Sequence, residues 1–245
     1  TVKCWGYGNY GQLGNGLTSN QYSPVSVDNI TTATSVSAGN GHSCAVLSGG
    51  TSKCWGYGGN GELGNGLTSN QSSPVSVDNI TTATSVSAGN NHSCSLLSGG
   101  TAKCWGFGGN GRLGNGSTSN QSSPVSVDNI TTATSVSAGG AHTCAVLSGG
   151  TAKCWGYDNN GQLGNNSSGD QSSPVSVNVS YIDKSGPTGS IVINNKSSYS
   201  SGKYNSVSLT LNATDSTAIV SYDLSSGRTY VTQTTSLSLS VTESK

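Results

Sequence analysis

The sequence predicts an all-β protein built mainly from propeller-type four-stranded blades, followed by a second β module. The first observation is a repeat with a period of 50 residues, marked by the motif Cys-Trp-Gly at Cys4, Cys54, Cys104 and Cys154. A fixed period of this size is typical of propellers, solenoids and arrays. The second observation is that short segments alternate apolar and small polar residues, whereas none keeps the apolar period of an α-helix.

Turn residues such as Ser-Gly-Gly divide each repeat into its predicted strands. The stretch "SPVSVDNITTATSVSAG" recurs unchanged from Ser23, Ser73 and Ser123, and a fourth copy departs after "SPVSV" at Ser173. The segment "HSCAVLSGGTSKCWGYG" from His42 predicts two strands around a Ser-Gly-Gly turn, which is a hairpin signal. About four repeats therefore occupy residues 1–178. We expect an incomplete or open ring with half a blade at its N-terminal end.

Glycines of the first repeat have the spacing of a dinucleotide-binding turn, at Gly6, Gly8 and Gly11. A nucleotide site needs a helix directly after these glycines, because the helix N-terminus binds the pyrophosphate. The following "QLGNGLTSNQ" is a turn-rich stretch with no helical pattern. The glycines recur in the later repeats, so they indicate tight turns and close chain approach within each blade.

Composition excludes several classes of function. The chain has ten Lys and Arg against ten Asp and Glu, and only 8% of its residues are charged. A nucleic-acid binder would be expected to show a basic excess. No apolar run approaches the roughly 18 residues that span a bilayer. We find no paired carboxylates or Ser/His/Asp set outside the repeat pattern, so the sequence predicts no enzyme, cofactor or metal.

Cysteines occur in pairs ten positions apart, on either side of each Ser-Gly-Gly turn. Opposed residues of a hairpin lie within disulfide reach. The sequence therefore favours disulfides over buried thiols and over a zinc site, which needs shorter spacing. Repeated disulfides favour an oxidising, extracellular or cell-surface location. The predicted pairs are Cys44 with Cys54, Cys94 with Cys104, and Cys144 with Cys154.

Cys4 is left without a partner in this pattern. Its expected partner would lie ten residues upstream, before Thr1. We expect either that the chain is a fragment or that Cys4 bonds another chain. An open propeller end also leaves unpaired strand edges, which a neighbouring copy could cover by strand exchange.

Aromatic and histidine side chains repeat with the scaffold. The predicted blade core contains a tryptophan from every repeat, with exposed aromatics for carbohydrate stacking as the alternative. His42, His92 and His142 each precede a paired cysteine by two residues, and we expect structural histidines that bond neighbouring loops. The predicted core tryptophans are Trp5, Trp55, Trp105 and Trp155.

Glycosylation motifs of the form Asn-x-Ser/Thr are frequent. A chain rich in Asn, Ser and Thr also generates such triplets by chance, and modification depends on the host. The sites singled out are Asn29, Asn79, Asn129, Asn70 and Asn120.

The repeated order A-G-x-x-H-[ST]-C-[AS]-[VL]-L-S-G-G-T-x-K-C-W-G-x-G-x-x-G-x-L-G resembles the regulator of chromosome condensation repeat family. The resemblance covers about residues 1–178 and implies a β-propeller, usually of seven blades. This chain has four Cys-Trp-Gly segments but only three A-G-x-x-H segments, too few for a seven-bladed ring. It also carries cysteines where intracellular relatives usually have other small residues. The family name implies nucleotide exchange on a GTPase, which zero net charge and the cysteines disfavour.

After Val177 the repeat ends, and residues 179–188 have the Gly, Pro and Ser content of a linker. Residues 189–245 alternate apolar and small polar residues, as in "SVSLTLNATD", and resemble the Ig-like modules of bacterial surface proteins. With some 57 residues, the sandwich could lack strands.

The sequence thus favours a non-enzymatic extracellular or cell-surface protein with a structural or adhesive role. A glycosylated fibre assembled from copies of the chain by strand exchange is a variant of this prediction. The expected partners are copies of the chain itself or another surface protein, with carbohydrate as a further option, and neither nucleic acid nor a membrane span. The alternative is a soluble propeller that binds or inhibits one protein partner through its loops.

Overall fold

The structure is a computed structural model that describes residues 1–178, 191–193, 205–212, 219–224, 227–232 and 236–243. The chain divides into two compact units, Thr1–Val179 and Ser180–Lys245. The predicted linker, residues 179–188, lies outside the described residues. Apart from one short 3-10 helix, η1 (Gly109–Gly111), every regular element in the described part of the chain is a β-strand, as predicted.

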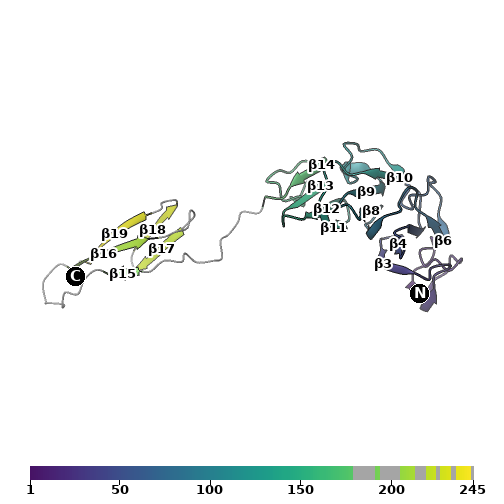
Figure 1. Ribbon diagram of the computed structural model, residues 1–245, viewed down its shortest axis with the longest axis horizontal. Helices are drawn as coiled ribbons and strands as arrows, with labels where there is room; N and C mark the ends of the chain where they lie inside the picture. Colours follow the sequence, from purple (N-terminus) through teal and green to yellow (C-terminus); the bar gives the residue numbers. More distant parts are fainter. Residues whose placement is uncertain (179–190, 194–204, 213–218, 225–226, 233–235, 244–245) are drawn as a thin grey trace. The chain divides into compact units, whose positions relative to one another are not determined.

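The first unit contains three antiparallel four-stranded sheets, which confirms the blade prediction (Figure 1). Each sheet keeps its four strands in chain order, so we call the sheets blades I, II and III. Blade I contains β3 (Ala33–Ala38), β4 (His42–Leu47), β5 (Ser52–Gly56) and β6 (Gln71–Ser76). Blade II contains β7 (Ala83–Ala88), β8 (His92–Leu97), β9 (Ala102–Gly106) and β10 (Gln121–Ser126). Blade III contains β11 (Ala133–Ala138), β12 (His142–Leu147), β13 (Ala152–Gly156) and β14 (Gln171–Ser176).

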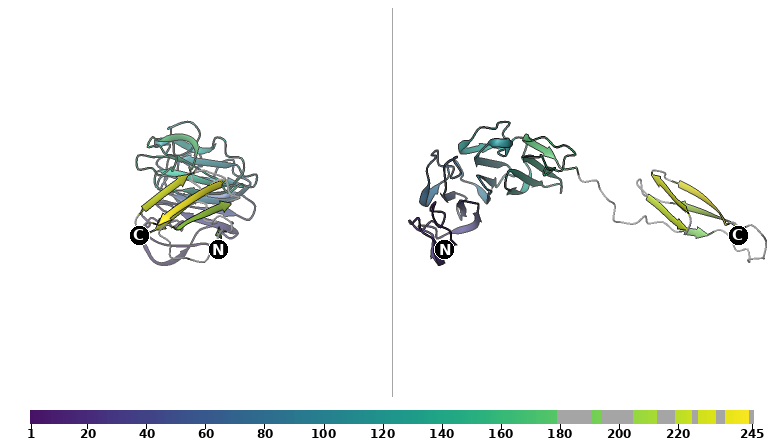
Figure 2. Two further views of the ribbon diagram at one scale, coloured as in Figure 1. Left: turned by 90° about the vertical axis from the view of Figure 1, so that its left-hand side faces the viewer. Right: turned by 180° about the vertical axis from the view of Figure 1, so that it is seen from behind.

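A two-stranded sheet precedes these blades. Strands β1 (Lys3–Gly6) and β2 (Gln21–Ser26) pair antiparallel and correspond to the last two strands of a blade. We call this sheet the half-blade. The blades follow one another along an arc (Figure 2), and the described residues form no closed ring.

Local sequence explains the strands and their ends. In blade I the turn between β4 and β5 uses Gly50, whose φ of 77° is accessible mainly to glycine. The proline of each repeat lies on the last strand of its sheet, as Pro74 does on β6. An outermost strand tolerates proline because its free edge needs no donor there.

The hydrophobic core lies between blades rather than within them. Residues from blades I and II share one cluster of nine buried residues that includes both Cys44 and Trp105. Blades II and III share a cluster of eleven buried residues, which includes Trp155. The cluster between the half-blade and blade I has four buried residues among the described ones, where the half-blade contributes two strands rather than four. A single blade cannot bury its own apolar side chains, so neighbouring repeats stabilise one another.

The second unit is described by its backbone alone. Strands β15 (Ile191–Ile193), β16 (Asn205–Asn212) and β19 (Ser236–Glu243) form one antiparallel sheet, and β17 (Ile219–Leu224) pairs with β18 (Gly227–Thr232). The β content of this unit matches the prediction. An Ig-like sandwich is not evident among the strands described, so the Ig-like assignment stays a prediction.

Candidate functional site: the open N-terminal blade

Each blade contacts the next through one set of hydrogen bonds that recurs with the period of the repeat. The indole nitrogen of Trp55 donates to the backbone carbonyl of Gln12, at 2.9 Å. Trp105 Nε1 and Trp155 Nε1 make the same bond to Glu62 and Arg112, at 2.8 and 2.9 Å. The acceptor is main chain, so the side chain at that position is free to change between repeats.

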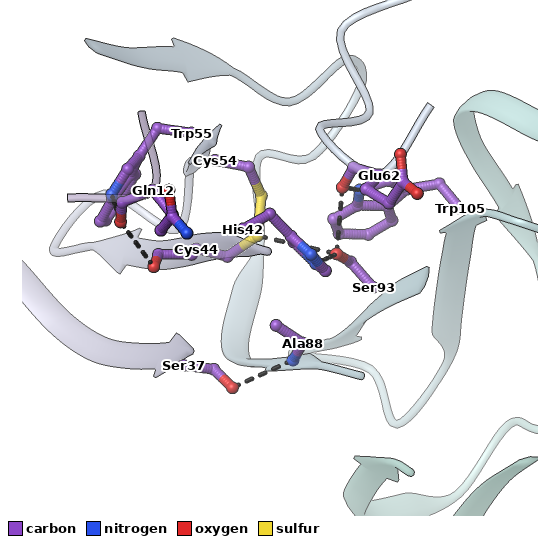
Figure 3. The surroundings of a disulfide bond; sticks show 11 residues. Gln12, Ser37, His42, Cys44, Cys54, Trp55, Glu62, Ala88, Ser93 and Trp105 are labelled. Carbon is purple, nitrogen blue, oxygen red and sulfur yellow. Dashed lines mark hydrogen bonds between the residues drawn. A yellow bond between two sulfur atoms is a disulfide. The ribbon is translucent and has the colours of Figure 1, made fainter. Parts of the chain in front are cut away.

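A second contact between successive blades is made by a histidine. It lies closer to the inner strands, β3, β7 and β11. His42 Nε2 lies 2.8 Å from Ser93 Oγ (Figure 3). The single proton of Ser93 is donated to the Glu62 carbonyl, so the histidine must be the donor. His92 makes the equivalent bond to Thr143 Oγ1, also at 2.8 Å. The expected structural role is therefore seen for His42 and His92, although their partners lie on a strand of the next blade rather than in a loop; no such bond is described for His142.

Burial controls the charge of these two histidines. It lowers the pKa of His42 to about 4. Burial, with a smaller contribution from Arg112, lowers the pKa of His92 to about 3. Both imidazoles are therefore neutral near pH 7, and the Nδ1 atom of each is buried with no hydrogen-bond partner among the residues that the structure describes.

Acidification is expected to destabilise the blades through His42 and His92. Their ordinary pKa is 6.5, so below that pH the unfolded chain binds protons that the folded chain excludes. The stabilisation is complete above pH 6.5 and is lost as pH falls toward 4 and 3, by about 1.4 kcal/mol per pH unit for each histidine. Urea unfolding between pH 7.5 and 5.0 measures the slope. A double variant, His42→Asn with His92→Asn, should flatten it, and an unchanged slope would contradict the assignment.

The half-blade has two strands in the described residues, whereas each of the following blades has four. In blade I, Cys54 on β5 is bonded to Cys44 on β4, whereas Cys4 on β1 has no such neighbour. A pocket of about 410 Å³ lies at this place, between β1 and the inner strands of blade I. Its lining includes Val2, Cys4, Trp5, Val36, His42 and Trp55.

Comparison with the other blades shows that the side chain of Val36 is exposed where its equivalents are buried. Val36 is 56% exposed, whereas the equivalent Val86 and Val136 are 7% and 9% exposed. Strands β3 and β4 of blade I contact β7, which carries Val86. The pocket beside Val36 therefore has an apolar floor and a thiol at its edge. Burial raises the pKa of the Cys4 thiol, so Cys4 is predominantly protonated near neutral pH.

The three predicted cysteine pairs are disulfides in the structure. Each bond joins adjacent strands across the Ser-Gly-Gly turn, with Cα atoms 4.1 Å apart. The three bonds are Cys44–Cys54, Cys94–Cys104 and Cys144–Cys154. Cys4 is the one free cysteine of the chain.

Three of the four predicted core tryptophans are buried. Trp55 is 1% exposed, and Trp105 and Trp155 are fully buried. The prediction is wrong for Trp5, which is 62% exposed. A buried tryptophan is covered by the loop of the preceding repeat, as Gln12 and Gly14 cover Trp55, and no such loop precedes Trp5 in this sequence.

The predicted glycosylation sites lie at the surface. All five side chains are exposed, and the Oδ1 atoms of Asn70 and Asn120 brace their loops by accepting a glycine N–H. Asn29, Asn79 and Asn129 share a positive φ of 52–53°, a turn conformation that asparagine tolerates well. The positive φ alone therefore accounts for asparagine at these three positions, whether or not a glycan is attached.

The part of the chain that the structure describes contains no group of three His, Cys, Asp or Glu side chains placed to bind a metal ion. None of its helices has the length and apolar character needed to cross a membrane.

The repeated blades and their periodic contacts define a tandem-repeat protein of the β-propeller class. Models of the regulator of chromosome condensation (RCC1) repeat match residues 2–46, 54–96 and 101–146, and a second model matches residues 33–62, 83–112 and 133–162. These matches cover more than half of the sequence, and the chain belongs to the RCC1 repeat family.

Solved structures show the same fold. Yeast RCC1 (Prp20) in its complex with Kap60 is 21% identical with a TM-score of 0.63, over 73% of this chain and 45% of that chain. Saccharomyces cerevisiae Prp20p, described with its binding to Gsp1p and histones, is 20% identical with a TM-score of 0.61, over 73% and 46%. Human WBSCR16 is 20% identical with a TM-score of 0.60, over 68% and 44%. The chain therefore spans less than half the length of these structures, and no curated protein sequence matches it.

Proposed function

We propose that this chain is a non-enzymatic extracellular or cell-surface structural or adhesive protein, with a fibre assembled from copies of the chain by strand exchange as a variant. The observation that carries the proposal is the hairpin disulfide that recurs in each of the three blades. The partner is another copy of the chain or another surface protein.

The three disulfides support the proposed extracellular or cell-surface location. Such bonds persist in oxidising compartments and are rare in the cytosol. They stabilise each blade within its hairpin, which suits a protein exposed outside the cell. The exposed asparagines support glycan decoration on the blade loops, and mass measurement before and after glycosidase treatment of native material tests it.

Near-identical blades support a structural role. The stretch "SPVSVDNITTATSVSAG" is unchanged in three repeats, so most of the surface presents the same groups several times. A site tuned to a single partner would differ from blade to blade. Electron microscopy and light scattering of the purified chain test the assembly, and a monodisperse monomer under oxidising conditions would exclude it.

Strand complementation is the expected way to fill the pocket. A peptide of residues 83–97 contains β7, β8 and the single cysteine Cys94, and it has the pattern that the half-blade lacks. Added in a glutathione redox buffer, it should form a disulfide with Cys4, because strand pairing raises the local thiol concentration. Intact mass spectrometry measures the adduct.

Two controls make the complementation test specific. A scrambled peptide that keeps its cysteine should react at least about tenfold more slowly, since it cannot pair with β1. A Cys4→Ser chain should form no adduct. Equal rates for both peptides would mean that Cys4 is merely an accessible thiol and that the edge of β1 accepts no strand.

A soluble propeller that binds one protein partner through its loops is the second candidate. The observation in its favour is that differences between repeats gather in the glycine-rich loops. Tyr10 takes the place of an asparagine in the other repeats and lies 5.3 Å from Tyr57, ring centre to ring centre, at the N-terminal end of the array. Loss of partner capture by Tyr10→Asn, with assembly intact, would favour this function.

A further inference from the structure

We propose that the loop between β13 and β14 of blade III binds a calcium ion through Asp158 and Asp170. This inference goes beyond the structural role proposed above and does not rest on it. It is carried by a buried carboxylate oxygen of Asp158 that has no hydrogen-bond partner among the described residues, and by three substitutions that set this loop apart from its equivalents.

Three residues distinguish the blade III loop from the equivalent loops of the earlier repeats. Asp158 replaces a glycine, Gly169 replaces a serine and Asp170 replaces an asparagine. In the earlier repeats a Cβ on the replaced glycine would lie 2.0 to 2.4 Å from the carbonyl oxygen of that serine. An aspartate at position 158 therefore requires the segment around residue 169 to move aside, and a glycine there gives the backbone that freedom. The substitutions act together to seat one additional side chain.

The two aspartates are joined by the hydrogen bond that anchors this loop. The Asp158 N–H donates to Asp170 Oδ1 at 2.9 Å. The Gly108 N–H donates to Asn120 Oδ1 in the same way in blade II, at 3.0 Å. Asp170 Oδ2 accepts a second bond from Asn110 Nδ2 at 2.7 Å. An amide oxygen is sufficient for the anchor in blade II, so the anchor does not explain why blade III has a second carboxylate beside Asp158.

The carboxyl group of Asp158 is only half satisfied. The side chain is fully buried, and its Oδ1 atom accepts the N–H of Leu163 at 2.9 Å. Its Oδ2 atom is also buried and has no hydrogen-bond partner in the part of the chain that the structure describes. Leaving a buried carboxylate oxygen unpaired is costly, because it has lost its water without gaining a partner. The loop therefore has an oxygen that is available to a ligand.

The burial of Asp158 is a property of its own loop. Gly58 and Gly108 are the equivalent residues of blades I and II. The nearest neighbours of a Cβ added to either glycine belong to the same loop, although another blade follows each of them. The contact of Asn110 with Asp170 comes from blade II, which precedes the site. The site is therefore formed within blades II and III and does not depend on either edge of the array.

Charge at the loop favours a cation. In the described loops, Arg112 donates to two carbonyl oxygens and to Asn110 Oδ1 rather than to the aspartates. Burial lowers the pKa of Arg112, and the charge of Asp170 opposes this change. Two carboxylates and one guanidinium leave one negative charge without a counterion.

The oxygen ligands point to calcium. Ca²⁺ takes about six to eight oxygens from carboxylates, main-chain carbonyls and water, in flexible geometry. Asp158 Oδ2, the Asp170 carboxylate and the Gly169 carbonyl belong to these classes. Asp170 is exposed, so water can complete the coordination. Mg²⁺ demands a near-ideal octahedron and gives up its water reluctantly. With two acidic ligands we expect a dissociation constant of about 0.1 to 1 mM, the range of extracellular calcium modules.

The test compares the full chain with two variants that remove the site. Asp158→Asn keeps the size of the side chain and removes its charge. A triple variant, Asp158→Gly with Gly169→Ser and Asp170→Asn, restores the loop residues of blades I and II, so it should fold as those loops do. Terbium ions replace Ca²⁺ in oxygen sites, and their luminescence is excited through nearby aromatic rings such as Tyr157, which precedes Asp158 in the sequence. Displacement of terbium by calcium chloride or magnesium chloride near pH 7 measures the affinity for each cation.

Glu62→Gln is the matched control. Glu62 is also a fully buried carboxylate in the equivalent loop of blade I, but both of its oxygens accept hydrogen bonds from Asn60. Glutamine occupies the equivalent positions 12 and 162, so the fold tolerates it there. The variant removes one buried negative charge and leaves Asp158 and Asp170 intact.

The parent chain and Glu62→Gln are expected to bind Ca²⁺ in the range given above, and Mg²⁺ at least about tenfold more weakly. Their thermal unfolding midpoints should rise by about 3 to 10 °C in about 10 mM calcium chloride. Asp158→Asn and the triple variant should lose the luminescence of one site and this rise in midpoint. Midpoints without calcium that match or exceed that of the parent would show that both variants fold.

A parent chain whose unfolding midpoint and terbium luminescence do not respond to calcium would overturn the proposal. A response that the triple variant keeps would also overturn it, since that response would come from another part of the chain. An equal loss in Glu62→Gln would make net charge, rather than the blade III loop, responsible for binding. Equal affinities for the two cations would overturn the choice of calcium.

Discussion

Trp105→Ala is expected to destabilise the blade array by about 3 to 5 kcal/mol. The indole is fully buried between blades I and II, where it packs with the Cys44–Cys54 bond, and donates to the Glu62 carbonyl at 2.8 Å. Alanine would leave a cavity in that core and would remove one of the two hydrogen bonds that the Glu62 carbonyl accepts, the other coming from Ser93. Gly64 lies against the ring and has no side chain that could fill the space.

Urea unfolding followed by tryptophan fluorescence and circular dichroism measures this effect. Trp5→Ala is the matched control, because the same residue in the same motif is exposed in the half-blade. Its effect on the free energy of unfolding of the monomer should stay below about 1 kcal/mol. Equal losses for the two variants would mean that burial between blades is not what the tryptophans contribute.

Reduction of the three disulfides is expected to remove most of the stability of the first unit. Each bond closes a hairpin with a sequence separation of ten residues. The chain-entropy estimate for such a loop is about 2.5 to 3 kcal/mol per bond. A domain is stable by about 5 to 15 kcal/mol, so losing all three bonds leaves it marginal.

Thermal unfolding with and without a phosphine reductant measures the loss, and mass analysis after alkylation counts the free thiols. A double variant, Cys94→Ala with Cys104→Ala, should lose about one third of the total effect. Cys4→Ser should lose nothing in the monomer, since Cys4 makes no bond there. A reduced chain that keeps its unfolding midpoint would remove the stability argument for an oxidising location.

Contacts within one hairpin could be predicted from the sequence. Cys44 and Cys54 lie at equal distances from Gly49, so the turn alone places them opposite one another. The strand order of each blade and the edge position of Pro74 follow from equally local patterns.

Contacts between repeats could not be predicted in this way. His42 bonds Ser93 at a separation of 51 residues, and Trp55 bonds Gln12 at a separation of 43 residues. No local pattern encodes these separations, because they depend on how one twisted sheet packs on the next. Sequence alone therefore predicted Trp5 to lie in the core. The motif around Trp5 is identical to that of the covered tryptophans. The missing signal was the identity of the covering loop, which comes from the preceding repeat.

The indole bond to a main-chain carbonyl has a consequence for how such a chain changes in length. Gln12, Glu62 and Arg112 differ in charge, yet each offers the same carbonyl to the next tryptophan. A gene that loses or gains one repeat by recombination therefore creates no mismatched junction. A chain without residues 51–100 should fold with two hairpin disulfides, countable by mass analysis, and a misfolded product would contradict this. The number of repeats can then change with little loss of stability at the junction.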